Sequence, residues 1–334
     1  MRRFDGFIKG INFGGWFSQC SNEDEHYRTF IGEADFKKVK EWGFDHIRIP
    51  VDYELFENPN GFKYLDEALD NAHKYNLNVV LDLHKTYGYS FDDGEGENGF
   101  FESEKLQEKF YELWDKLAKR YVSRSSYVAF ELLNEVTDIK YCDIWNEIAD
   151  RTVKLIRQYS KDIKIIVGGY HNNAVSAIKD IDIDFDENIV LNFHCYEPLL
   201  FTHQGAYWIK TMPKDFRIPY HTSFSDYLKI AHEHNIPLII DDGVKDLNDT
   251  PSPQFFENLF KEAINIACKR DLPLYCGEYG VIELTDINET LKWYLDIHEV
   301  FAKYGIGHAL WSYRKMDFDF ENERYDEIRH KIIG

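Results

Sequence analysis

Several patterns that would assign a sequence to a functional class at once are missing here. The five cysteines are odd in number and include no C-x-x-C pair, which argues against a disulfide framework or a zinc site and favours a reducing compartment. Lys and Arg total 39 against 59 Asp and Glu, which gives a formal charge of −20, and no basic run occurs. Because a negative field repels phosphate backbones, we expect no nucleic-acid partner.

Long hydrophobic runs are also absent. No stretch reaches the length of a membrane-spanning helix, so we expect no membrane partner, and we expect the protein to be a monomer. Residues 1–5 (MRRFD) are not followed by the apolar segment of a secretory signal. We therefore expect either a cytoplasmic protein or a secreted one whose signal is not part of this sequence.

Cofactor and metal motifs are missing too. The glycine patterns G-x-G-x-x-G and G-x-x-x-x-G-K-[ST] do not occur, and neither does H-E-x-x-H. His84 and His194 each end a predicted strand, so a metal-dependent barrel hydrolase, with a glutamate as third ligand, stays open as an alternative. Without a matching spacing we expect no metal and no cofactor.

Short apolar runs alternate with amphipathic stretches along all 334 residues. This pattern predicts an α/β protein, a single (β/α)8 barrel that covers residues 1–334, rather than an open doubly wound sheet, whose phosphate-binding signature is lacking. The predicted helices include residues 33–42, 64–75, 103–121, 141–159, 224–234, 255–269, 287–304 and 323–333. The predicted strands are residues 8–13, 46–50 (closed by Pro50), 79–83, 128–133, 163–167, 189–193, 274–277 and 307–311.

The unit that follows the sixth strand is oversized. An insertion at about residues 197–254 contains Tyr207, Trp208, His221 and Tyr227. Long connections after barrel strands lie over the active face. We therefore expect a small subdomain that shapes substrate access.

Polar and aromatic side chains stand where the predicted strands end. In a parallel barrel all these ends meet at one mouth. Two of the residues are glutamates, and paired carboxylates about 5–5.5 Å apart are the equipment of a retaining glycosidase. Alone, either glutamate could equally be a salt-bridged residue of the mouth. The set is Arg48, His84, Asn134, Glu135, His194, Tyr196, Glu278 and Trp311.

The neighbours of the two glutamates suggest different roles for them. Arg48 and the Tyr196 hydroxyl are expected to hydrogen-bond Glu278 and to favour its charged form, as a nucleophile needs. The negative charge of Glu278 is expected to raise the pKa of Glu135, as an acid/base needs. This assignment is a hypothesis at this stage.

Other residues of the mouth fit sugar binding. The amide of Asn134 is suited to bond a sugar 2-hydroxyl, although asparagine is also common at the start of loops. Aromatic residues make up 16% of the chain, and Trp311 and Trp16 could stack on sugar rings. Core packing is the alternative for both, on equal terms for Trp16.

The sequence resembles glycoside hydrolase family 5, and within it a group of clostridial endoglucanases. The resemblance implies a (β/α)8 fold, with Glu135 as acid/base, Glu278 as nucleophile, and Arg48, His84, Asn134, His194, Tyr196 and Trp311 around the cleaved bond. Family members often have proline after the acid/base motif, where this chain has Val136. The matching segments are residues 10–16 (GINFGGW), 44–50 (FDHIRIP), 82–84 (DLH), 133–135 (LNE), 192–196 (NFHCY), 277–280 (GEYG) and 310–311 (LW).

The resemblance implies an endo-β-1,4-glucanase that acts on soluble β-glucans or cello-oligosaccharides by double displacement. Within the same family, a β-mannanase or glucomannanase, a mixed-linkage β-glucanase and an exo-acting cellodextrinase remain alternatives, because loops rather than motifs select the sugar. A non-catalytic carbohydrate-binding barrel is the alternative of another class. Its mark would be the loss of a carboxylate, and both glutamates are present.

Overall fold

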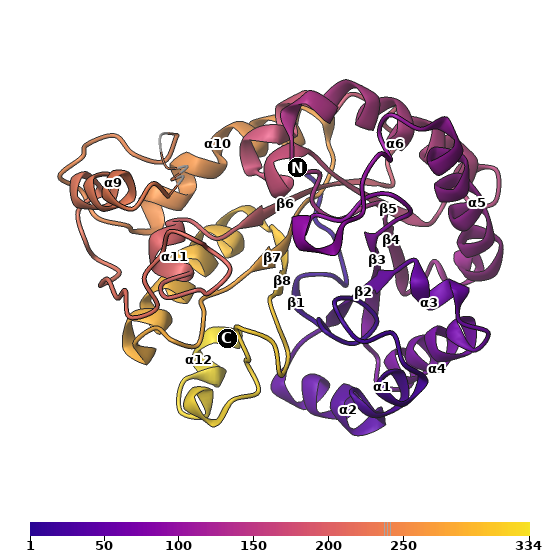
Figure 1. Cartoon of the computed structure of the whole chain (residues 1–334), viewed down its shortest axis with the longest axis horizontal. Coiled ribbons are helices and arrows are strands. Elements are labelled where there is room, and N and C mark those ends of the chain that lie inside the picture. The colour runs from indigo at the N-terminus through magenta and orange to yellow at the C-terminus, as the bar shows by residue number, and fades with distance from the viewer. Residues whose placement is uncertain (237, 239, 241) are drawn as a thin grey trace.

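Eight parallel strands pair in sequential order, and the eighth pairs with the first to close a barrel (Figure 1). The computed structural model describes residues 1–334 except 237, 239 and 241, and only the backbone of Asp93. The predicted fold class is confirmed. The strands are β1 (Lys9–Asn12), β2 (His46–Asp52), β3 (Asn78–Lys85), β4 (Val128–Glu131), β5 (Lys164–Gly168), β6 (Ile189–Cys195), β7 (Leu274–Tyr279) and β8 (Gly307–Leu310).

Helices surround the barrel and bury the apolar faces that the sequence predicts. The Ser103 hydroxyl accepts a hydrogen bond from the backbone of Leu106 and caps α5, as expected. Among the described residues, no helix is long and apolar enough to cross a membrane. The helices are α1 (Asp24–Thr29), α2 (Glu33–Trp42), α3 (Glu54–Glu57), α4 (Gly61–Lys74), α5 (Glu104–Tyr121), α6 (Cys142–Arg157), α7 (Tyr170–Asn173), α8 (Leu199–Thr202), α9 (Phe224–Glu233), α10 (Pro253–Arg270), α11 (Ile287–Tyr304) and α12 (Arg329–Ile333).

Two local predictions were wrong. Pro50 does not end β2, which continues to Asp52, because the proline nitrogen points toward β1 at a level that β1 no longer reaches. The helix predicted at residues 323–333 is broken into a 3₁₀ turn, Glu323–Tyr325, and α12. The unit after β5, in which no helix was predicted, has a four-residue turn (α7) and a 3₁₀ segment, Val175–Asp180.

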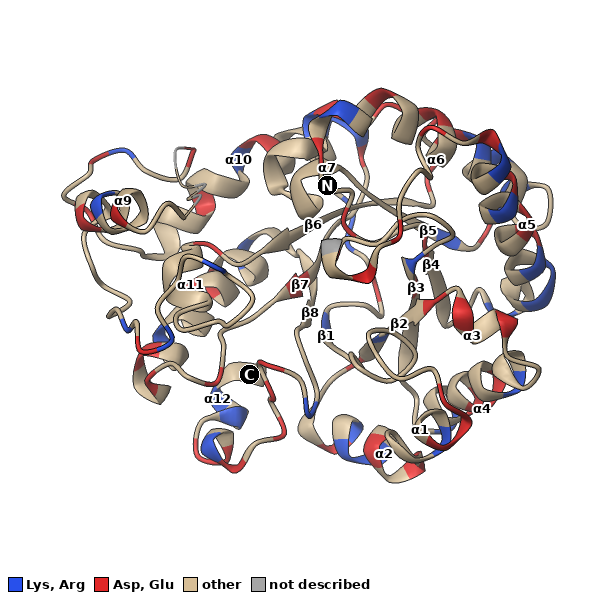
Figure 2. Ribbon diagram, in the orientation of Figure 1, with Lys and Arg blue, Asp and Glu red and all other residues tan. Residues whose placement is uncertain are grey.

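The barrel interior is apolar at one end and polar at the other. Phe4 and Phe7 stack at 4.2 Å and close the floor, where they pack with a cluster of inward-facing strand residues. Above this floor the interior contains buried charged and amide side chains, while most of the other charged residues lie on the outer helices (Figure 2). Polar chemistry is therefore concentrated at the carboxyl ends of the strands.

The insertion predicted at residues 197–254 contains α8, α9 and long loops, and residues 237, 239 and 241 within it lie outside the described residues. Its α9 lies at the edge of the molecule beside α10 (Figure 1). The Tyr220 hydroxyl donates to Asp296 of α11 (3.0 Å), which anchors the insertion to the barrel's outer helices. The Tyr207–Trp208 segment extends in the other direction, toward Phe318 in the loop after β8.

Candidate active site

The guanidinium of Arg48 on β2 lies at the centre of the polar end of the barrel. It is fully buried and contacts three carboxylates, whose summed charge exceeds its own. Such a group is stable only when its hydrogen bonds are satisfied. Its nitrogens contact Glu131 Oε2 (2.7 Å) and Oε1 (2.9 Å), Glu278 Oε1 (2.7 Å), Asp82 Oδ2 (2.9 Å), Asn12 Oδ1 (3.0 Å) and Asn134 Oδ1 (2.9 Å).

Glu278 on β7 receives a donor at each carboxylate oxygen. Arg48 Nη1 donates to Oε1 (2.7 Å) and the Tyr196 hydroxyl donates to Oε2 (3.0 Å). Both predicted contacts of Glu278 are therefore present. They fix the carboxylate in one orientation at the mouth.

Glu135 follows β4 and adopts a left-handed backbone conformation with φ of 41°. Its backbone carbonyl accepts a hydrogen bond from the Tyr89 hydroxyl (2.6 Å). His194 Nδ1 lies 2.7 Å from Oε1, and Asn172 Nδ2 donates to Oε2 (2.9 Å). A carboxylate oxygen of Glu135 lies within 4.8 Å of one of Glu278. The two acids thus face each other at a separation near that of retaining glycosidases, about 5–5.5 Å.

Burial raises the pKa of both carboxyl groups. For Glu278 the neighbouring His194 and the positive charge of Arg48 oppose this rise, while for Glu135 the hydrogen bond from Asn172 opposes it. The predicted cause of the raised pKa of Glu135 was the charge of Glu278, but loss of water is the main cause. Of the two facing acids, Glu278 has a direct ion pair with Arg48 and Glu135 does not, so the charged form of Glu278 is the better stabilised.

Several polar atoms at the mouth are buried without a hydrogen-bond partner among the described residues. They include the donor-capable nitrogens His84 Nε2 and Asn134 Nδ2, and buried polar atoms in native proteins normally find a partner. The His84 ring stacks parallel to Trp311 at 5.8 Å. A hydroxylated ring lying against Trp311 would place its oxygens where these nitrogens can bond them.

Trp16 is the one predicted site residue that the structure does not bring to the mouth. Its indole stacks on Phe17 at 3.9 Å, and its N–H donates to the carbonyl of Tyr27 (2.8 Å). It is buried in the main core. Core packing, the alternative given equal weight, therefore accounts for Trp16.

Several residues of the site were not predicted. Glu131 and Asp82 lie behind Arg48, and a carboxylate within an apolar strand is the sequence signal that could have indicated them. Asn12 and Asn192 connect Arg48 and Glu131 to the backbone of Gly277. Asn172, which contacts Glu135, had no local signal.

Glu135, His194 and Glu278 together resemble a metal-binding set among the described residues. However, His194 Nδ1 and Glu135 Oε1 are 2.7 Å apart, which is a hydrogen bond. Ligands at about 2.0–2.2 Å from a tetrahedral zinc would be roughly 3.3 Å apart. The set therefore fits a hydrogen-bonded network better than a zinc site.

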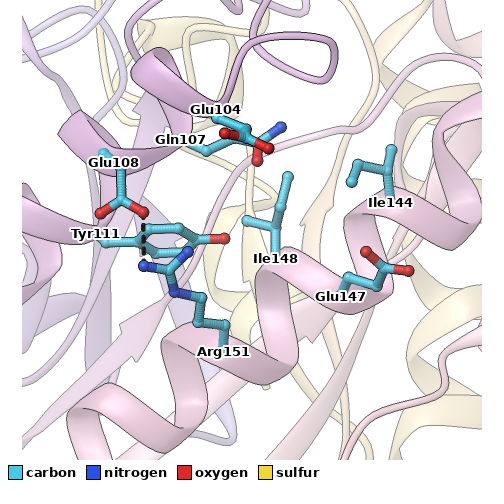
Figure 3. Close-up of a pocket in the computed structure, with 8 residues that line it drawn as sticks. All are labelled: Glu104, Gln107, Glu108, Tyr111, Ile144, Glu147, Ile148 and Arg151. Atoms are coloured by element: carbon cyan, nitrogen blue, oxygen red, sulfur yellow. Dashed lines mark hydrogen bonds and ion pairs between the residues drawn. The ribbon is translucent and has the colours of Figure 1, made fainter.

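A hollow of about 390 Å³ lies between α5 and α6, on the outside of the barrel (Figure 3). Arg151 lies over the ring of Tyr111 at 4.0 Å and pairs with Glu108 at 2.6 Å. This outer hollow does not include any residue of the mouth described above.

Comparison with known proteins gives consistent matches over almost the whole chain. Residues 9–317 match the family model described as cellulase (glycosyl hydrolase family 5). Cellodextrinase A of Ruminococcus flavefaciens is 40% identical over 94% of this chain and 88% of its own length. Endoglucanase C of Acetivibrio thermocellus is 35% identical over 98% of this chain and 97% of its own length.

The fold has solved counterparts as well. The crystal structure of endoglucanase Cel5A from Thermotoga maritima superposes with a TM-score of 0.76 at 23% identity, covering 98% of this chain and 97% of that one. At this identity the likeness concerns the fold.

We predict that Arg48→Met lowers the free energy of unfolding by about 3–5 kcal/mol near pH 8, because it leaves buried carboxylates unpaired. The loss should be smaller near pH 5. Burial raises the pKa of Asp82 to about 7 and raises that of Glu131, so the folded state binds more protons than the unfolded state and loses stability as pH rises. Removing Arg48 raises these pKa values further.

Urea unfolding at the two pH values measures this difference. Arg120→Met is the matched control, because Arg120 pairs with Asp66 at the surface and should cost less than about 1 kcal/mol at either pH. Equal losses for the two variants, or a larger Arg48→Met loss at the lower pH, would contradict the assignment of Arg48 as the centre of a buried charge cluster.

Proposed function

This chain belongs to glycosyl hydrolase family 5 and is a glycoside hydrolase, and from that premise we propose that it is a retaining endo-β-1,4-glucanase. The observation that carries the proposal is the approach of Glu135 and Glu278 to within 4.8 Å. Inverting enzymes keep their carboxyls about 6.5–9.5 Å apart, to leave room for a water between the general base and the anomeric carbon. Here a carboxylate can attack the sugar directly.

In the first step Glu278 attacks the anomeric carbon, and its C–O bond to the sugar forms as the glycosidic C–O bond breaks. The Arg48 ion pair and the Tyr196 hydrogen bond favour ionised Glu278 and orient it for attack. Glu135 gives its proton to the departing oxygen, so the leaving sugar departs as an alcohol. Burial favours the protonated form of Glu135 that this requires.

In the second step a water replaces the departed sugar. Glu135, now a carboxylate, removes a proton from the water as it attacks the anomeric carbon. The ester bond to Glu278 breaks, and Glu278 regains its charge beside Arg48. Two inversions at one carbon leave the configuration of the product unchanged.

The mouth offers contacts suited to one pyranose ring. Trp311 supplies an apolar face, while His84 Nε2 and Asn134 Nδ2 are free to bond hydroxyls. Arg48 donates to Asn134 Oδ1, which fixes the direction of the amide N–H₂ group of Asn134. We assign this N–H₂ group as a hydrogen-bond donor to the sugar 2-hydroxyl. This contact would strengthen in the transition state.

Further aromatic side chains extend from the proposed pyranose site toward solvent. The Tyr196 ring contacts His203 at 5.0 Å and Phe318 at 5.7 Å, and Trp208 lies beyond both. Trp208 is 40% exposed, which is unusual for a large apolar residue. We assign Trp208 to a neighbouring sugar of the glucan chain, so that the insertion contributes to substrate binding.

Soluble β-1,4-glucans and cello-oligosaccharides are the substrates that we propose, acted on by a monomer. The relatives named endoglucanase and cellodextrinase support glucan chains of different lengths. The relative named cellodextrinase also keeps exo-acting trimming of short chains as a second candidate. The presence of both carboxylates opposes a purely carbohydrate-binding role.

We predict that Glu278→Ala loses nearly all activity and that azide restores turnover of an activated aryl β-cellobioside as the inverted α-cellobiosyl azide. The small anion occupies the space of the missing carboxylate and attacks from the same side. Glu135→Ala should instead yield the retained β-azide, because Glu278 still forms the ester. Proton NMR of the anomeric position distinguishes the two products, and the opposite pairing of variant and product would reverse the roles.

A second prediction concerns chain length. Carboxymethylcellulose, lichenan, glucomannan and cellohexaose are digested, and the products are resolved by size. Endo action predicts a fall in the viscosity of carboxymethylcellulose and oligomers of mixed length from the start of the reaction. Trp208→Ala should raise KM for cellohexaose about five- to tenfold, the equivalent of roughly 1–1.4 kcal/mol of stacking.

The control for this variant is Tyr159→Ala, which removes an exposed aromatic in the turn after α6 and should leave KM unchanged. Release of one terminal product from all four substrates would favour the exo-acting candidate. An unchanged KM in Trp208→Ala would remove Trp208 from the proposed binding site.

A further inference from the structure

The chain leaves β5 through a left-handed turn. His171, Asn172 and Asn173 have φ values of 50°, 57° and 55°, three consecutive residues in a region that residues with a Cβ rarely adopt. Asparagine tolerates this region better than most residues, but a run of three persists only where the surroundings enforce it. The turn therefore needs an explanation beyond the connection of two elements.

The side chains of the turn lead to both oxygens of Glu135. Asn172 Nδ2 donates directly to Oε2 (2.9 Å). Asn173 Nδ2 donates to His194 Nε2 (3.3 Å), and His194 Nδ1 lies 2.7 Å from Oε1. One asparagine thus acts directly on the carboxylate, and the next acts through a histidine.

The surrounding packing is shaped to hold this turn. Gly168, at the end of β5, has no side chain, and a Cβ there would lie 2.2 Å from Asn173 Oδ1. The backbone N–H of Asn172 donates to the carbonyl of Val136, next to Glu135 (3.0 Å). The Trp145 indole donates to the carbonyl of Gly168 (2.9 Å). Contacts to Gly168 at the start of the turn and to Asn172 within it therefore fix the backbone of the turn.

We propose that Asn172 and Asn173 are positioning residues for the acid/base, which hold Glu135 with an N–H donor on each carboxylate oxygen and fix the tautomer of His194. This inference rests on the proposed role of Glu135. It assigns a task in the reaction to two residues outside the predicted set. Asn172 contacts the acid/base directly, and Asn173 acts on it only through His194.

The tautomer follows from burial and geometry. Burial lowers the pKa of His194 to about 4, so the ring is neutral at higher pH and carries a single N–H. Because Nε2 accepts from Asn173, the proton resides on Nδ1 and is donated to Glu135. The hydrogen bond from Asn173 thereby fixes the tautomer in which His194 donates to Glu135 and stabilises its charged form.

This arrangement suits a group that must be an acid and then a base. Burial raises the pKa of Glu135, which favours the acid of the first step, and the amide of Asn172 lowers it, which favours the base of the second. Neither the protonated nor the ionised form of Glu135 is therefore strongly favoured over the other. The other titratable groups facing Glu135 from their strands and loops are Arg48, Asp82, His84, Tyr89, His194, Tyr196 and Glu278.

The experiment compares Asn172→Gly, Asn172→Asp and Asn173→Asp with the wild type. Glycine keeps the left-handed backbone and removes the amide, while aspartate keeps the shape and removes the donor. Asn76→Gly is the matched control, because Asn76 is also left-handed (φ 52°) but lies between α4 and β3, at the opposite end of the barrel. Thermal melting verifies that each variant folds.

The readout is the pH dependence of kcat/KM for two aryl β-cellobiosides, one with a poor and one with a dinitrophenolate leaving group. Asn172→Gly should raise the basic-limb pKa by about one unit, the value of one hydrogen bond to a charged group, and Asn172→Asp should raise it further. The effect should appear with the poor leaving group, which needs the proton. Asn76→Gly should match the wild type.

Asn173→Asp should reverse the tautomer of His194, since an aspartate accepts from Nε2–H and leaves Nδ1 without a proton. The charged form of Glu135 then loses a donor, so breakdown of the glycosyl-enzyme slows and a burst of dinitrophenolate appears. Nitrogen-15 NMR of labelled histidine should show the change of protonated nitrogen directly.

The outcomes separate the failure of this inference from that of the proposed function. A folded wild type that hydrolyses neither cellobioside would defeat the proposed function itself. An active wild type with Asn172→Gly and Asn173→Asp profiles that coincide with Asn76→Gly would overturn the positioning role. An equal loss of kcat/KM at every pH with both leaving groups would also overturn it. So would a change in KM alone for Asn172→Gly, which would make Asn172 a substrate contact.

Discussion

The single guanidinium of Arg48 is the constraint on which the active site depends. It is fully buried among Asp82, Glu131 and Glu278, and each of these carboxylates would be costly in the barrel without it. Glu131 takes two of its hydrogen bonds and fixes its plane. The remaining donors then point to Glu278, Asn12, Asn134 and Asp82. The orientation of one cation therefore determines where the attacking oxygen lies.

The barrel separates this charge cluster from the rest of the core. Phe4 and Phe7 close the apolar floor, and the polar layer lies above it at the carboxyl ends of the strands. Here burial has two effects on the acids: it raises the pKa of Glu135, and it strengthens the ion pair that opposes the same rise in Glu278. Two glutamates in one environment are thus given different tasks by their partners.

Most of the fold and the centre of the site could be predicted from the sequence, because both follow local patterns. Apolar runs located the eight strands, and the residues that end them located Glu135, Glu278 and Arg48. What was missed depends on contacts between distant segments. The burial of Trp16 beside Phe17, the continuation of β2 past Pro50 and the left-handed turn at Asn172 are set by neighbours that no window of sequence contains.

The central claim is that Glu278 forms a bond to the sugar while Glu135 handles the proton. The most direct test uses a 2-deoxy-2-fluoro-β-cellobioside with a dinitrophenolate leaving group. The fluorine slows both steps, and the good leaving group keeps the first step fast enough for the intermediate to accumulate. Mass spectrometry of the peptic digest then locates the label. The account predicts one cellobiosyl ester on Glu278; a label on Glu135, or complete turnover to an inverted sugar with no labelled peptide, would contradict it.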